Sequence, residues 1–538
     1  MPQARLVRRL ARCLDTADAR TQLIETDISW VLLAGGLAYK FKKAIRRDVL
    51  DYGSLAARRF ACEEELRLNR RLAPELYLGL STATGSQACP SMDGAGPALD
   101  VAVRMRRFPQ SALWQARLDA GQLGTLEVKE LAALLADFHA RAPRATRALP
   151  WGSGRLIRAR TMQDLDGIVA LASSSRQQGM LADIASWISA QHHGLKRIFA
   201  RRKEDGWVRE CHGDLHLANI LTLDGLVRVF DGIEFSSGLR WIDVAQDLAF
   251  IWMDLQCHGQ PRLAARLLND YLECSGDYGS LAVLPYYRVQ RALVRCKVAL
   301  QRTLPGTPGR IAALKQAACY LAFAHAHTVP GAASLIIAHG LSGSGKSWLC
   351  DALVEPLEAV RLRSDVERKR LYAGAVMPAT GWYDSIRNAA TYRRLARLAR
   401  TALLAGFTVL VDAAFLERDK RLVFCRLAQR CHVAFLLLHV SAPLALLQSR
   451  LAERAASGHD PSDADHAVLA GQMARFGPQG LLAEELGNAV VVLNDAGFGS
   501  VAVAGLACRL RRTLRRNAAP VRDEHGVMGS DDGLPPID

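Results

Sequence analysis

Residues 340–347 read GLSGSGKS and fit the pattern G-x-x-x-x-G-K-[ST], a loop that requires a strand before it and a helix after it. The apolar segment 335–339 predicts the strand, and the residues after the loop predict the helix. Further apolar strands are expected at 407–415 and 432–440, separated by helical segments. Strands that alternate with helices form parallel sheets, so the C-terminal part of the chain is predicted to be an α/β domain.

The glycines of this loop allow backbone N–H groups to surround phosphate oxygens at the first turn of a helix. Lys346 is then expected to reach the β- and γ-phosphates of a nucleotide, and Ser347 to ligate Mg²⁺. Asp412 ends the strand at 407–415 and is suited to orient the same ion. The predicted phosphate-binding residues are Gly340, Ser342, Gly343, Ser344, Gly345, Lys346 and Ser347.

Three other charged residues of this part each have two interpretations. Asp365 follows the expected second strand, where it would be a base or an anchor for an acceptor, or else the N-cap of a helix. Arg450 and Arg454 lie four residues apart on one face of a predicted helix. They would either close over the phosphates or form a solvated basic surface.

A second motif lies upstream, where HGDLHLAN at 212–219 follows the pattern H-G-D-x-H-x-x-N. Kinase-type phosphoryl transfer needs a carboxylate that accepts the proton of the attacking hydroxyl, and an amide oxygen and a second carboxylate that hold magnesium. Asp214 is the expected base, and Asn219 and Asp231 are the expected metal ligands. In the alternative without catalysis, Asp214 caps a helix and Asn219 makes a turn.

Such a site also needs a lysine on a strand, paired with a glutamate on a helix. AYKFKK places Lys40 and Lys42 on the same face of a strand, and CEEELRLN supplies Glu65. We expect Lys40 to pair with Glu65, with Lys42 as the alternative. No G-x-G-x-x-G precedes the lysine, so a plain hairpin at Gly35-Gly36 is expected to cover the phosphates.

These motifs carry a resemblance to known families. Residues 25 to 300 resemble the aminoglycoside phosphotransferase branch of the protein-kinase-like fold, in which H-G-D replaces H-R-D. Residues 333 to 510 resemble small P-loop kinases of the gluconate kinase, chloramphenicol phosphotransferase and zeta-toxin type. The order of the two parts resembles a bacterial family of bifunctional aminoglycoside phosphotransferase-like/P-loop ATP-binding proteins (AAA family ATPase-type). The resemblance implies ATP and Mg²⁺ as cofactors, and it implies that His139, Asp243 and Asp247 are structural.

The predicted organisation is an α+β protein-kinase-like region fused to an α/β P-loop domain with a parallel sheet. Its small lobe spans 1–110 and its large helical lobe, with the catalytic loop, spans 111–328. The turn-rich segments TLPGTPGR and VPGAAS separate this region from the P-loop domain, at 329–515. The polar segment 516–538 is predicted to be disordered.

Composition limits the partners and the compartment. The 12 cysteines are scattered, without a C-x-x-C pair, which favours a reduced, cytoplasmic protein. The basic N-terminus lacks the apolar core of a signal peptide, and the apolar run at 433–447 falls short of a membrane span, so no membrane partner is expected. The net charge of +16 would suit nucleic acid, but the arginines are spread along the chain, which disfavours that partner.

The sequence therefore favours an ATP-dependent phosphotransferase with two nucleotide sites, which acts on a hydroxyl of a small molecule. One alternative is a regulatory ATP-binding protein in which only the P-loop domain turns over. Another is a nucleic-acid kinase or binder, which rests on the charge alone. The acceptor and the oligomeric state are left open at this point.

Overall fold

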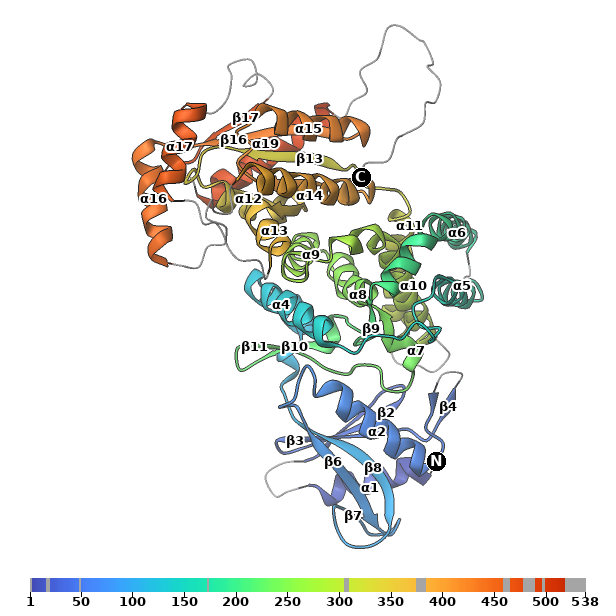
Figure 1. Cartoon of the computed structure of the whole chain (residues 1–538). Coiled ribbons are helices and arrows are strands. Elements are labelled where there is room, and N and C mark those ends of the chain that lie inside the picture. Colours follow the sequence, from blue (N-terminus) through green and yellow to red (C-terminus); the bar gives the residue numbers. More distant parts are fainter. Residues whose placement is uncertain are drawn as a thin grey trace. The chain divides into compact units, whose positions relative to one another are not determined.

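The computed structural model describes residues 2–15, 20–47, 50–171, 174–303, 309–373, 384–457, 465–477, 489–495 and 499–517. The chain divides into two compact units. The first comprises Met1–Gly331 with the short segments Val354–Leu362 and Leu404–Phe407, and the second comprises the remainder (Figure 1). The segment predicted to be disordered begins at 516, but residues 516 and 517 belong to a helix that ends at Asn517. The rest of this segment lies outside the described residues.

The N-terminal part of the first unit is a six-stranded sheet with the strand order β1-β2-β3-β8-β6-β7. Neighbouring strands run antiparallel, and Gly35 with a positive φ makes the tight turn between β2 and β3. The elements here are α1 (Pro2–Cys13), β1 (Gln22–Glu25), β2 (Ser29–Ala34), β3 (Leu37–Lys42), β4 (Arg46–Arg47), β5 (Leu50–Asp51), α2 (Leu55–Asn69), β6 (Tyr77–Gly85), β7 (Pro90–Met92) and β8 (Ala98–Arg106).

Both faces of this sheet are covered because its strands alternate apolar residues to either side. In β8, Val101 and Val103 belong to the apolar cluster that Cys62 of α2 joins. Ala102 points the other way, into the cluster that contains Leu6 and Leu10 of α1. Ser54 caps α2 by accepting a hydrogen bond from the backbone N–H of Ala57 at 3.1 Å, which fixes where the helix starts.

A helical part follows in the same unit (Figure 1). Its helices are α3 (Trp114–Asp119), α4 (Thr125–Arg141), α5 (Gly154–Val169), α6 (Ser175–Glu204), α7 (Ser237–Arg240), α8 (Val244–Cys257), α9 (Pro261–Ser275), α10 (Leu284–Gln301) and α11 (Arg310–Ala326). Short 3₁₀ turns lie at Gln110–Ala112, Leu217–Asn219 and Tyr278–Ala282. The core is formed largely by α8, of which Val244 to Leu255 are all buried.

Two small antiparallel ladders in this part hold the H-G-D segment. Strand β9 (Val208–Glu210) pairs with β12 (Trp241–Asp243), and the H-G-D residues begin at His212, after Cys211. Strands β10 (Ile220–Leu223) and β11 (Leu226–Val229) form a hairpin between Asn219 and Asp231. Asp224 and Gly225 both have positive φ in its two-residue turn, as the sequence predicts for an Asp-Gly hairpin.

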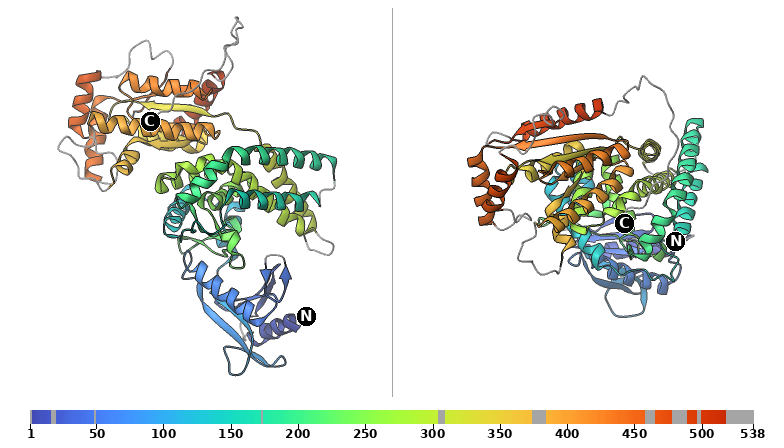
Figure 2. Two further views of the ribbon diagram at one scale, coloured as in Figure 1. Left: turned by 45° about the vertical axis from the view of Figure 1, so that its right-hand side comes forward. Right: turned by 45° about the horizontal axis from the view of Figure 1, so that its top comes forward.

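The second unit contains most of a five-stranded sheet with the order β14-β15-β13-β16-β17, in which β13 pairs parallel with β15 and β16, and β16 with β17. Helices α14 and α15 lie side by side on the same face of it, with Lys420 of α15 over the ring of Tyr392 of α14 at 4.6 Å (Figures 1 and 2). The elements are β13 (Ser334–His339), α12 (Lys346–Leu357), β14 (Val360–Arg363), α13 (Ser364–Leu371), α14 (Ser385–Leu404), β15 (Val409–Asp412), α15 (Arg418–Arg430), β16 (Ala434–Ser441), α16 (Leu444–Ser457), α17 (His466–Phe476), β17 (Ala489–Leu493) and α19 (Ser500–Asn517).

The predicted fold class is thus confirmed in both parts. Strand β13 and helix α12 flank the G-x-x-x-x-G-K-S loop as its pattern requires, and all six residues of β13 are buried, as expected for a central parallel strand. Within the described ranges, no helix combines the length and the hydrophobicity that crossing a bilayer would need.

Candidate functional site

The loop that carries Asp214 is anchored by its own backbone. The N–H groups of His212 and Gly213 donate to the two carboxylate oxygens of Asp247, on α8, at 3.0 and 2.9 Å. Gly213 has a φ of +87°, and a Cβ there would lie 2.8 Å from the backbone O of Leu239. Only glycine fits this position, which explains the middle residue of H-G-D.

Asp214 is the centre of this loop. Asn219 donates through Nδ2 to the backbone O of Asp214 at 2.9 Å and to its Oδ2 at 3.1 Å, and His216 Nε2 lies 3.3 Å from the same Oδ2. Burial opposes the charged carboxylate, but the interactions with His216, followed by the charges of Arg295 and His212, hold the pKa of Asp214 below its ordinary value. Asp214 is therefore ionised at neutral pH, and 37% of its side chain is exposed.

Lys40 links the sheet to the segment after β11. Its Nζ lies 2.8 Å from Oε1 of Glu65, on α2, and it also contacts a carboxylate oxygen of Asp231. Asp231 has a φ of +63°, and its backbone N–H donates to the Tyr77 hydroxyl at 3.1 Å. The structure thus brings together Lys40, Glu65 and Asp231, which are up to 191 positions apart in the chain.

The choice between Lys40 and Lys42 has a geometric answer. Lys42 is fully buried, and its Nζ contacts Glu65 and Glu234, while the hydroxyl of Tyr52 donates to Glu234. Burial opposes the charge of Lys42, but Glu234 and Glu65 raise its pKa overall. Lys42 therefore carries an internal charge beneath the sheet, and Lys40 is the lysine that contacts Asp231. Sequence reasoning missed both Glu234, which lies in DGIEF at 231–235, and Tyr52, which lies in a distant segment of the chain.

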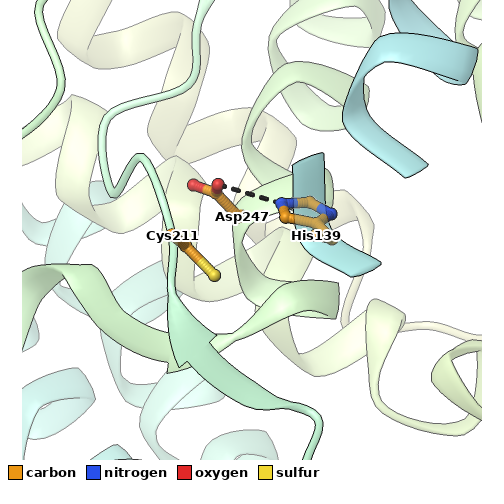
Figure 3. Close-up of side chains that lie close together, drawn as sticks. All are labelled: His139, Cys211 and Asp247. Carbon is orange, nitrogen blue, oxygen red and sulfur yellow. Dashed lines mark hydrogen bonds and ion pairs between the residues drawn. The ribbon is translucent and has the colours of Figure 1, made fainter. Parts of the chain in front are cut away.

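Beneath the loop, His139, Cys211 and Asp247 lie close together, with ligand atoms within 4.8 Å of one another (Figure 3). The donors, however, have partners within the protein. His139 contacts Asp247 Oδ2 through Nε2 at 3.2 Å and the Tyr271 hydroxyl through Nδ1 at 2.9 Å, and Cys211 Sγ donates to the backbone O of Ile242 at 3.5 Å. Burial raises the pKa of the Cys211 thiol, which disfavours the thiolate that a metal binds. The cluster is a hydrogen-bonded support for the loop.

Asp247 predicts how this support responds to acid. Burial opposes its charge, but the hydrogen bond and charge of His139 hold its pKa at about 2, below its ordinary 3.8. The ionised Asp247 carboxylate stabilises the folded loop fully above pH 4, and this contribution is lost as the pH falls toward 2. The loss is about 1 kcal/mol at pH 3 and about 2 kcal/mol in all. The free energy of local opening of residues 208–219 should be higher in the wild type than in Asp247→Asn. We expect this difference to be about 1 kcal/mol smaller at pH 3 than at pH 6. Hydrogen exchange of residues 208–219 at pH 6 and pH 3 measures it, and an unchanged difference contradicts the prediction.

Asp243 does not contribute to this support, although the resemblance groups it with Asp247. It caps α8 by accepting from the backbone N–H of Ala245 at 2.9 Å. Its carboxylate oxygens also accept from Arg202, on α6, at 2.7 and 2.8 Å. The same guanidinium donates to Asp277 at 2.8 and 2.7 Å, so Asp243 belongs to a separate buried ion cluster.

In the second unit, three glycines give the G-x-x-x-x-G-K-S loop its shape. Gly340, Gly343 and Gly345 all have positive φ. A Cβ at Gly340 would lie 2.2 Å from the backbone O of Val440, and one at Gly343 would lie 2.7 Å from the backbone O of Leu447. The loop is therefore packed against the ends of neighbouring elements, with Lys346 Nζ donating to the backbone O of Leu341 at 2.8 Å.

Both sites offer oxygen donors of the kind that Mg²⁺ prefers. Ser347 Oγ lies 3.1 Å from Oδ1 of the buried Asp412, so a hydroxyl and a carboxylate meet beside the loop. In the first unit, the amide nitrogen of Asn219 is directed to Asp214, which leaves its amide oxygen for a cation. Asn219 with Asp231, and Ser347 with Asp412, therefore fit the ion that the fold implies.

The remaining predicted residues are placed differently. Asp365 is not an N-cap: α13 begins at Ser364 with Arg363 as its cap, and Asp365 pairs with Arg368 one turn later at 2.5 Å. Arg450 Nη1 reaches the backbone O of Ser344 at 3.5 Å. The backbone of Arg454 belongs to α16, but its side chain lies outside the described residues.

Two residues that the sequence did not single out hold the phosphate loop. Asn494, which follows β17, donates through Nδ2 to the backbone O of Ser344 at 2.9 Å. Gln472, on α17, accepts from the backbone N–H of Ser342 at 2.9 Å. Both come from distant segments, and no local pattern distinguishes them from other polar residues.

Comparison with known proteins agrees with this division. Residues 335–479 match a family described as AAA domain. The uncharacterized protein Rv2004c of Mycobacterium tuberculosis is 29% identical over 456 residues, which cover 84% of this chain and 89% of that protein. The likeness therefore extends across both units.

Solved structures of kinases are similar to portions of the chain. Choline kinase from Cryptosporidium parvum is 12% identical, with a TM-score of 0.37, and the match covers 56% of this chain and 88% of that one. APS kinase CysC from Mycobacterium tuberculosis is 21% identical, with a TM-score of 0.26, covering 35% and 99%. Residues 335–479 are thus similar in sequence to the AAA domain family, and the N-terminal unit combines an antiparallel sheet with a helical part.

Proposed function

We propose that this protein is an ATP-dependent phosphotransferase with two nucleotide sites, one in each unit, and that it phosphorylates a hydroxyl of a small molecule. One observation carries the proposal. Lys40, on β3, contacts both Glu65 and Asp231, while Asn219 holds Asp214 in the loop beside them. This is the set of groups that kinase-type phosphoryl transfer needs, assembled from the sheet, α2 and the loop.

The residues of the first unit would have three roles. Asp214 would accept the proton of the attacking hydroxyl, and the contact with Asn219 fixes its orientation. Lys40, held by Glu65, would stabilise the charge on the nucleotide phosphates. Asn219 and Asp231 would hold Mg²⁺, which supplies further charge neutralisation to the phosphates when bound.

The second unit would bind its nucleotide through the backbone of 340–345 and through Lys346. The lysine would leave the backbone O of Leu341 to contact phosphate oxygens. Ser347 and Asp412 would hold the ion of this site. The proposal makes the two sites separate, because each has its own lysine, its own carboxylate and its own phosphate-binding loop.

ADP release tests the two-site proposal. Purified full-length protein is incubated with ATP, Mg²⁺ and a pooled metabolite extract, next to Lys40→Met, Lys346→Ala and the double variant. Each single variant should slow turnover at its own site about a hundredfold, because the lysine no longer stabilises the charge on the phosphates there. Each should therefore remove a distinct share of the total extract-dependent turnover. Lys43→Met is the matched control, since Lys43 lies next to Lys42 but pairs with Glu25.

The outcomes separate the alternatives. If Lys346→Ala removes all turnover and Lys40→Met removes none, the first unit is regulatory and the two-site proposal is wrong. If extract-dependent turnover in the double variant stays near the wild-type level, neither site has the proposed role. If turnover depends on added oligonucleotide and not on the extract, the acceptor is a nucleic acid.

A further inference from the structure

Helix α10 carries three arginines on one face, namely Arg288, Arg291 and Arg295. Each guanidinium lies over an aromatic ring. Arg288 lies over Trp252 at 4.7 Å, Arg291 over Phe250 at 4.6 Å and Arg295 over Tyr320 at 5.7 Å. The rings come from α8 and α11, which pack against α10 (Figures 1 and 2).

Carboxylates compensate this stripe of positive charge only in part, because burial lowers the pKa of Arg291, whereas Tyr320 and the charges of Asp254 and Asp214 raise that of Arg295 in spite of its burial. Among the described residues, none of the three guanidinium groups forms an ion pair with a carboxylate within 4.0 Å. Arg291 is 5% exposed, donates through Nε to the backbone O of Gln246 at 3.1 Å, and has no hydrogen-bond partner at Nη2. Burying a cation without a carboxylate is costly, so a purely structural position would favour a neutral residue.

Arg295 is connected to the loop of Asp214 through hydrogen bonds of Tyr320 and Asp254. Its Nε lies 3.5 Å from the Tyr320 hydroxyl, which donates to Asp254 Oδ1 at 2.8 Å. The other oxygen of Asp254 accepts from the backbone N–H of Leu217, in the loop of Asp214, at 3.0 Å. Arg295 is half-buried, as is Arg288 at the other end of the stripe, whereas Arg291 between them is buried.

Asp214 interacts with His216, with the guanidinium group of Arg295 and with His212, whose pKa is lowered by burial. A hydroxyl that reaches the Asp214 carboxylate therefore meets the positive charge of Arg295. A cationic acceptor would meet repulsion from Arg295, and the aromatic faces of Trp252, Phe250 and Tyr320 are already covered by guanidinium groups. An acceptor with an oxyanion group would instead be attracted and could accept charge-assisted hydrogen bonds.

We propose that the first unit takes an anionic acceptor, a hydroxyl compound with a carboxylate or phosphate group, and that Arg295 binds this group beside Asp214. The inference rests on the proposed function, because it places the acceptor of that same site. Arg291, behind Arg295, adds to the positive potential without contacting the acceptor. Arg288 is furthest along the helix from the loop and provides a matched control.

A series of probes on one three-carbon skeleton tests the charge preference. The probes are glycerate, glycerol 3-phosphate, glycerol and 3-amino-1,2-propanediol, at matched ionic strength, with AMP-PNP and Mg²⁺ present. Binding is measured as the rise in the midpoint of thermal unfolding, in full-length Lys346→Ala protein so that the second unit binds no nucleotide. Stabilisation by the two acids and not by the amine is expected, and their ratio shows whether the subsite prefers carboxylate or phosphate.

Arg295→Gln should weaken the binding of the anionic probes about tenfold and leave the AMP-PNP response unchanged, because one charge-assisted contact is lost. Arg288→Gln, on the same helix and also over an aromatic ring, should keep the wild-type response. Stabilisation by the amine equal to that by the acids, or an unchanged response in Arg295→Gln, overturns the inference.

ADP release with the same probes separates this inference from the proposed function. Anion binding that Arg295→Gln weakens as expected, without ADP release from any probe or from the extract, supports the subsite and counts against phosphoryl transfer. Release that depends on Asp214 and is fastest with the amine supports phosphoryl transfer and overturns the anionic acceptor. For an active acid, Arg295→Gln should raise the KM of the acid about tenfold while the KM of ATP stays constant.

Discussion

An Asp214→Asn variant is expected to lose the phosphoryl transfer of the first unit by about a thousandfold in kcat, within the range of 10² to 10⁴ that a positioned base contributes. Asparagine keeps the size of the side chain but cannot accept the proton of the attacking hydroxyl. Because interactions with His216 hold the pKa of Asp214 below its ordinary value, the wild-type rate should show no loss from this group between pH 8 and pH 5. The KM for ATP should change little, since the proposed nucleotide contacts come from other residues.

The measurement is extract-dependent ADP release in the Lys346→Ala background, with the fold checked by circular dichroism. Asp137→Asn is the matched control, because Asp137 is an exposed aspartate of α4 that pairs with Arg141, one turn along the same helix. A fold that is intact with a rate above a tenth of the wild-type value would show that Asp214 is not the base.

Replacing Arg202 with methionine is expected to give the largest loss of stability, about 3–5 kcal/mol in the free energy of unfolding. Arg202 is buried on α6 and holds both Asp243 and Asp277, whose side chains are each 2% exposed. The substitution would leave two carboxylates in the interior without their shared cation. The loss should also loosen the start of α8, because Asp243 is its N-cap.

Urea denaturation of the full chain measures this effect. The control is Arg201→Met, which changes the adjacent arginine of the same helix, whose side chain is 83% exposed. Its expected effect is within about 0.5 kcal/mol, as for most surface substitutions. A loss below about 1 kcal/mol for Arg202→Met would show that the two carboxylates find other partners.

The sequence alone determined the features that depend on neighbouring residues. The spacing of GLSGSGKS requires a strand, a loop of positive-φ glycines and a helix, and the structure has β13, that loop and α12. Asp224-Gly225 between two apolar segments requires a tight hairpin, which β10 and β11 form. These signals are reliable because only a few residue types can adopt the backbone conformations that such turns need.

The tertiary structure decided between alternatives that the local sequence pattern could not distinguish. Lys40 and Lys42 share a strand face, and only the packing of Glu234 and Tyr52 against Lys42 assigns it to the interior. Asp365 resembled a cap, but the helix begins at Ser364.

Asn494 and Gln472 hold the phosphate loop, and Arg295 reaches the loop of Asp214 through Tyr320, although each belongs to a segment far along the chain. Pairings of this kind depend on burial and on the approach of distant segments. The free energy of a buried charge is fixed by its surroundings in space, which the order of residues along the chain does not reveal.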